Sequence, residues 1–115
     1  MIVFDRIVAI LIMLLGAIHS VFSPVFHGHY DDAGMWFLGG GLMMAFLGLM
    51  NLVRTASAGA AACRAALAAN VLGLAFVLAL VPLFPLRQNP QVPVFIVLVV
   101  TATILSIARH DTHAA

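Results

Sequence analysis

The chain has 115 residues, of which 64% are hydrophobic and only 8% are charged. A soluble globular domain typically carries about 25% charged residues, so this composition excludes a chain that covers itself with a water-facing surface. The formal net charge is +1 and the arginines are scattered. Without a basic patch, nucleic acid is excluded as a partner.

Four apolar stretches fill most of the chain, and each has about the 17–25 residues that an α-helix needs to cross a bilayer. Short connections make successive helices antiparallel neighbours. The sequence therefore predicts an all-α fold, an integral membrane antiparallel four-transmembrane-helix bundle that forms a single domain over residues 1–115. The predicted spans are Ile7–Phe26, Met35–Val53, Ala65–Phe84 and Val92–Ala108.

The first stretch contains His19, the one ionisable residue well inside a predicted span. It lies about 10 Å from the C-terminal end of the stretch, from the helical rise per residue. An ionisable side chain at that depth is costly and indicates a functional site. The structural alternative is a neutral imidazole bonded to a backbone group or to a hydroxyl such as Ser23, which shares its helical face. Both interpretations remain open.

The connection after the first stretch reads His27-Gly28-His29-Tyr30-Asp31. Imidazoles and carboxylates placed close together are plausible ligands for Zn²⁺ or Cu²⁺. His27, His29 and Asp31 are therefore the candidate metal residues, and Zn and Cu are the candidate cofactors. Two histidines in a loop do not form a specific motif.

The second stretch carries a stripe of small residues, in which Gly34, Gly41 and Gly48 recur every seven residues with Ala45 between them. Helices in lipid associate through such small residues because their backbones can approach closely. The stretch opens with Trp36 and Phe37. These aromatics favour the headgroup zone, and with His19 and Ser23 they are the candidate ligand-binding residues.

Polar residues near the other end of the bundle are Asn51 and Asn70, joined by Thr103 or Ser106. Antiparallel helices place them at a similar depth, so we expect hydrogen bonds that hold the bundle together. Prolines at positions 82, 85, 90 and 93 are expected to end the helices around the third connection.

The arginines predict the orientation of the chain. Arg6, Arg54, Arg64 and Arg109 fall on one side of the four spans and Arg87 on the other. Basic residues in short loops favour the cytoplasmic side, so both termini are predicted to be cytoplasmic.

The order Gly16-Ala17-Ile18-His19, followed by Trp36-Phe37 at the start of a glycine-rich span with Gly41 and Gly48, resembles a set of small bacterial four-helix membrane proteins of unknown function. The resemblance covers residues 10–53. It implies a multi-pass protein of the bacterial cytoplasmic (inner) membrane and no known activity.

Three functions remain as hypotheses. The first is binding or transport of a small apolar or lipid-like ligand in the outer half of the bundle, near His19. The others are an outward-facing metal site and a structural or accessory subunit. The partners expected are the lipid bilayer and either a second copy or another membrane protein. No catalytic residue is predicted, because Ser20 beside His19 points to another helical face and no nucleophile–base pair is evident.

Overall fold

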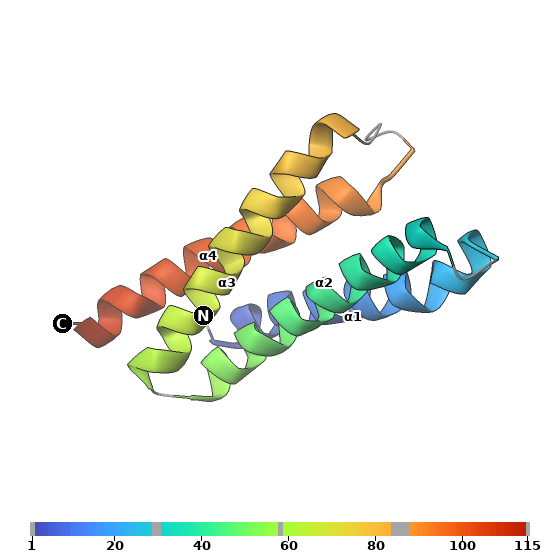
Figure 1. Cartoon of the computed structure of the whole chain (residues 1–115). Helices are drawn as coiled ribbons and strands as arrows, with labels where there is room; N and C mark the ends of the chain where they lie inside the picture. Colours follow the sequence, from blue (N-terminus) through green and yellow to red (C-terminus); the bar gives the residue numbers. More distant parts are fainter. Residues whose placement is uncertain (1, 29–30, 58, 84–87, 115) are drawn as a thin grey trace.

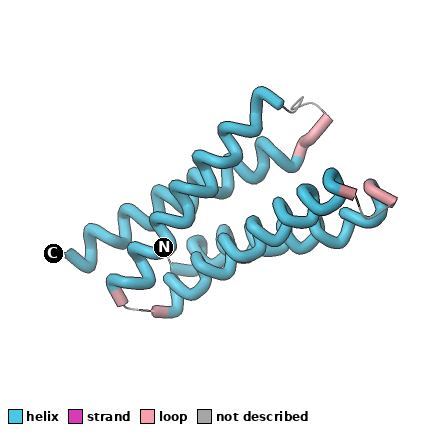
Figure 2. The backbone as a smooth tube through the Cα atoms, viewed as in Figure 1, coloured by secondary structure: helices cyan, strands magenta, loops and turns pink. Residues whose placement is uncertain are grey.

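The computed structural model describes residues 2–28, 31–57, 59–83 and 88–114, with side chains described as far as Arg109. The described chain is helical apart from its short connections (Figures 1 and 2). The elements are α1 (Ile2–Phe26), α2 (Asp32–Ala56), α3 (Ala60–Leu80), the short 3-10 helix η1 (Val81–Leu83) and α4 (Gln91–Ala114).

All four α-helices are long and apolar enough to cross a membrane. The molecule is 51 Å long, which matches a bilayer of about 40–45 Å including its headgroups. Large apolar side chains cover its outside, among them Val3, Val21, Leu72 and Val97. Such a surface is unfavourable in water and suits a lipid environment. The prediction of an all-helical chain with four helices of spanning length is confirmed.

The helices are longer than the apolar stretches that predicted them. α1 begins more than a turn before Ile7, and α2 continues past Val53 to include Arg54. At its start, α2 is capped by Asp31, whose Oδ1 accepts a hydrogen bond from the Gly34 amide at 2.7 Å. A side-chain oxygen at this position satisfies a backbone donor that the helix itself leaves unpaired.

Two hairpins make up the bundle, α1 with α2 and α3 with α4. Both termini and the α2–α3 connection lie at one end, which we call the inner end; the opposite end is the outer end. Figure 1 shows the two hairpins together at the inner end and diverging towards the outer end. Their shared core contains Ile12, Leu47, Val77 and Val99.

The α1–α2 hairpin is held by contacts between backbones. A Cβ atom on Gly48 would lie 2.7 Å from the Ala9 carbonyl oxygen, and one on Gly41 would lie 2.8 Å from the Gly16 carbonyl oxygen. Real side chains do not come this close to backbone atoms, so only glycine fits. Gly34, Gly41 and Gly48 are all buried, and the predicted packing stripe is confirmed.

The prolines of the third connection stand where helices end. Pro82 lies in η1, and Pro93 lies in the first turn of α4, where a backbone N–H has no partner within the helix. Pro90 directly precedes α4. Pro85 falls outside the described residues.

Candidate functional site

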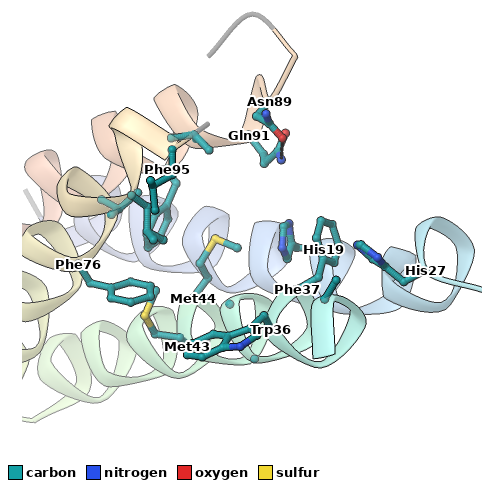
Figure 3. A pocket seen from close by; sticks show the side chains of 17 residues that line it. His19, His27, Trp36, Phe37, Met43, Met44, Phe76, Asn89, Gln91 and Phe95 are labelled. Carbon is teal, nitrogen blue, oxygen red and sulfur yellow. Dashed lines mark hydrogen bonds between the residues drawn. The ribbon is translucent and has the colours of Figure 1, made fainter. Parts of the chain in front are cut away.

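A cavity of about 720 Å³ lies between the two hairpins in the outer half of the molecule (Figure 3). All four α-helices contribute to its wall. Cavities of about 300–1,000 Å³ that are mostly apolar are typical of small-molecule sites. The side chains that line the cavity include His19, His27, Trp36, Phe37, Met43, Met44, Phe76, Gln91 and Phe95.

His19 forms part of the wall together with Phe37 of the facing helix. The two rings are stacked, with centroids 3.7 Å apart and an angle of 16° between their planes. The imidazole is half-buried. Its Nε2 atom lies 3.8 Å from the position of a Cβ on Gly40, so a ring nitrogen lies beside the cavity wall.

Three consecutive glycines explain why the cavity exists at this place. Gly41 packs against α1 and has no room for a side chain, whereas Gly39 and Gly40 line the cavity. A Cβ on Gly39 would meet nothing within 4 Å, and one on Gly40 would meet only His19. Side chains at these two positions would therefore occupy the cavity instead of clashing with a neighbouring helix.

Three of the four predicted ligand-binding residues, His19, Trp36 and Phe37, line this cavity. Ser23 is placed differently. It is buried between α1 and α2, where its Oγ donates a hydrogen bond to the Gly34 carbonyl oxygen at 2.9 Å. Its hydroxyl is used to join the two helices. The assignment of these residues to a ligand stays a prediction.

The predicted metal residues are only partly described. His27 lines the cavity and lies near Phe37, with ring centroids 5.3 Å apart. The Asp31 carboxylate caps α2, and His29 lies outside the described residues. Within the described ranges, no three His, Cys, Asp or Glu side chains come together to hold a metal ion. The metal site stays a prediction.

The polar residues predicted near the inner end do join three helices. Asn51 and Asn70 exchange two side-chain hydrogen bonds, at 2.7 and 3.0 Å, and Asn70 also donates to Ser106 Oγ at 3.0 Å. All three side chains are fully buried. Thr103 does not take part, because its hydroxyl donates to the Val99 carbonyl oxygen of its own helix. The predicted polar layer is confirmed for Asn51, Asn70 and Ser106.

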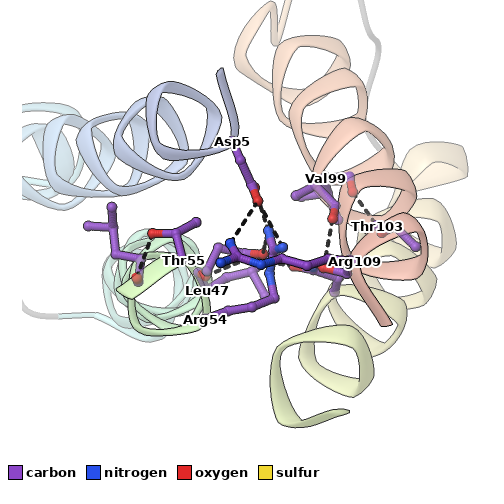
Figure 4. Close-up of polar contacts among 12 residues, drawn as sticks. Asp5, Leu47, Arg54, Thr55, Val99, Thr103 and Arg109 are labelled. Carbon is purple, nitrogen blue, oxygen red and sulfur yellow. Dashed lines mark hydrogen bonds and ion pairs between the residues drawn. The ribbon is translucent and has the colours of Figure 1, made fainter. Parts of the chain in front are cut away.

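The sequence reasoning missed an ion pair that extends this layer to α1 (Figure 4). Arg54 is fully buried, and its guanidinium binds both carboxylate oxygens of Asp5, one of them at 2.9 Å. It also donates to Asn51 Oδ1 at 3.3 Å. Arg109 NH1 lies 3.7 Å from the same carboxylate. We call Asp5, Asn51, Arg54, Asn70, Ser106 and Arg109 the inner polar network.

One signal in the sequence could have revealed the pair. Asn51 and Arg54 are three residues apart and therefore share a helical face. A buried asparagine then implies that the arginine on the same face is also turned inward. Such an arginine needs an acid, and Asp5 is the acid nearest the matching end of α1. Because the predicted span ends at Val53, Arg54 falls in the following connection, where an arginine needs no buried acid.

The two sites differ in what they can do chemically. In the inner polar network the buried groups bond to one another across all four helices, so the network stabilises the bundle. The cavity presents aromatic and aliphatic surface with a few hydrogen-bonding groups, which suits non-covalent binding. A scan against protein-family models, a search of curated proteins and a search of solved structures each found no match to this chain.

Proposed function

We propose that this chain is a multi-pass protein of the bacterial inner membrane that binds a small apolar or lipid-like ligand in its outer cavity, without catalysis. The observation that carries the proposal is the cavity itself. It measures about 720 Å³, and the predicted residues His19, Trp36 and Phe37 all contribute to its wall.

The chemistry of the wall supports an apolar occupant. Met43, Met44, Phe76 and Phe95 supply flexible and aromatic surface, and methionine adapts readily to ligands of different shape. A ligand that moves from the bilayer into this cavity exchanges one apolar environment for another. Its binding therefore relies on close contact with these side chains and on a few polar groups that orient it.

The distribution of charge supports an inner end in the cytoplasm. Arg6 and Arg64 are exposed there, whereas Arg54 is neutralised by Asp5 and adds little to the count. The predicted excess of basic residues on this side thus rests mainly on Arg6, Arg64 and Arg109. We propose that both termini face the cytoplasm and that the cavity lies in the periplasmic half of the membrane.

The proposal is tested by filling the cavity. Phenylalanine in place of Gly40 would place a ring where the ligand lies, because the only atom near the new Cβ is His19 Nε2 at 3.8 Å. Trp36 is the single tryptophan of the chain. It lines the cavity and is also 76% exposed, so an alkane outside the cavity can reach it as well. A brominated long-chain alkane should quench the Trp36 fluorescence saturably in the unaltered protein. In Gly40→Phe the affinity for the alkane should be at least about tenfold lower, which corresponds to losing the contacts of roughly one well-placed apolar group.

The matched control is Gly40→Ala, which also raises helix propensity and leaves most of the cavity open. It should keep saturable quenching. Non-saturable quenching of equal strength in all three proteins would mean that Trp36 meets the probe only from the surrounding micelle, and the proposed function would then be wrong.

Neither of the other predicted functions is favoured by a contact among the residues that the structure describes. The metal site and the accessory subunit, together with association with a second copy or another membrane protein, stay predictions.

A further inference from the structure

We infer that the cavity selects an uncharged amphiphile, with its polar head between His19 and Gln91 and its apolar tail directed towards the inner end. This inference rests on the proposed function and adds the chemical class of the ligand. The class includes long-chain alcohols, neutral glycerides and quinones, which share an uncharged head with oxygen atoms.

The described side chains that line the cavity include no aspartate, glutamate, lysine or arginine. Two acids precede the lining residue Ala33 in the sequence: the Asp31 carboxylate is engaged as the cap of α2, and Asp32 is exposed and is not among the lining residues. Apart from the imidazoles of His19 and His27, no described side chain of this wall can offer a charge to an ionised head, which would lose its water on entering. That cost is several kcal/mol for a charge in apolar surroundings, so the wall favours a neutral head.

Hydrogen-bonding side chains line the cavity on two sides. Gln91 is the first residue of α4 and lies across the cavity from His19, with Asn89 beside it (Figure 3). One N–H of Gln91 donates to Asn89 Oδ1 at 3.3 Å. A glutamine amide offers two N–H donors and one acceptor oxygen, and a neutral imidazole offers one donor and one acceptor. Both side chains therefore offer hydrogen-bonding groups to a polar head in this part of the cavity.

The polarity of the cavity wall changes along its length. His19, Asn89 and Gln91 lie towards the outer end, whereas Phe76 and Phe95 lie further in (Figure 3). Phe95 is buried in the core of the bundle. A molecule with one polar end therefore fits in one direction only, with its head at the outer end and its tail between the hairpins.

The test compares heads of different charge on one tail. Dibrominated stearyl alcohol, its sulfate ester and the quaternary ammonium analogue each report binding through quenching of Trp36. We expect the alcohol to bind at least about tenfold more tightly than either ion, because burial of an unpaired charge costs more than the 1.4 kcal/mol that a factor of ten represents. Equal or tighter binding of the sulfate or of the ammonium compound overturns the inference.

Two variants test the position of the head. His19→Phe keeps the stacked ring on Phe37 and removes both nitrogens, and Gln91→Leu keeps the size of the side chain and removes the amide. Each variant should lower the affinity for the alcohol by about threefold to tenfold, the range of one net hydrogen bond. The affinity for the brominated alkane should stay unchanged. An equal loss of affinity for the alcohol and for the alkane would show that these residues only shape the cavity, and it would overturn the assigned position of the head.

Binding of the alkane tests the proposed function, and the preference for the alcohol over the ions tests the selection of a neutral head. If the alkane binds saturably and the alcohol shows no preference over the ions, the cavity binds ligands but does not select neutral heads. If the alkane does not bind saturably, the proposed function fails and the inference fails with it.

Discussion

Two serines on one helix meet the facing helix in opposite ways. Ser23 Oγ donates to the Gly34 carbonyl oxygen at 2.9 Å, whereas Ser20 Oγ is buried against Gly41 and has no hydrogen-bond partner among the described residues. We expect Ser23→Ala to lower the free energy of unfolding by about 0.6 kcal/mol, the average for such bonds between membrane helices. Ser20→Ala should leave it unchanged or raise it by about 1 kcal/mol, because an unpaired buried hydroxyl is removed.

Reversible unfolding in mixed micelles with increasing sodium dodecyl sulfate measures both changes. The two variants are matched controls for each other, because each removes one hydroxyl that lies between α1 and α2. A loss of stability in Ser20→Ala as large as that in Ser23→Ala would contradict the described difference in bonding.

At this scale the sequence identified residues more readily than their partners. His19 is conspicuous because an ionisable group inside an apolar stretch is rare and costly. Helical periodicity correctly places Ser23 on a face near His19. It does not say which of the two turns towards α2 and which towards the cavity, because that depends on how α1 rotates when its backbone meets Gly41 and Gly48.

Adjacent glycines on α2 allow a test at the scale of the helix pair. A Cβ on Gly41 would lie 2.7 Å from the Ser20 amide nitrogen, whereas one on Gly40 has its nearest neighbour at 3.8 Å. We expect Gly41→Ala to reduce the free energy of unfolding by about 2 kcal/mol, because overpacking forces the two backbones apart. Gly40→Ala should be neutral or slightly stabilising, since alanine favours the helix.

The same unfolding titration measures this pair of variants. Equal effects of the two substitutions would show that α1 and α2 are not held by the backbone contact at Gly41. The small-residue spacing was readable from the sequence, because a seven-residue repeat of glycine keeps to one helical face. The ends of the helices were not, because hydropathy falls at Asp5 and Arg54 although the helices continue and pair these charges with each other.

Across the whole molecule, the Asp5–Arg54 pair ties α1 to α2 within a network that reaches all four helices. Removing one member of a buried ion pair leaves the other uncompensated, which costs about 3–5 kcal/mol. We expect Asp5→Leu to be the more harmful single change, because it leaves both Arg54 and Arg109 without this acid. Arg54→Met should cost less, since Arg109 lies 3.7 Å from Asp5.

A double-mutant cycle isolates the interaction. The protein with both Asp5→Leu and Arg54→Met should be more stable than the sum of the single losses implies, because Arg54 is no longer left buried without its acid. Arg6→Gln is the control, since Arg6 is exposed and adjacent to Asp5 in the chain; it should change stability by less than about 0.5 kcal/mol. Strictly additive losses would contradict the pairing.

The placement of these bonds also indicates the order in which they can form as the chain is synthesised. Asp5 and Arg54 both belong to the first hairpin, and Asn70 and Ser106 both belong to the second. The first two helices can therefore leave the insertion machinery with their buried acid and base already neutralising each other. The second pair enters with its own internal hydrogen bond. The exchange between Asn51 and Asn70 and the approach of Arg109 to Asp5 join the two hairpins and wait for them to meet.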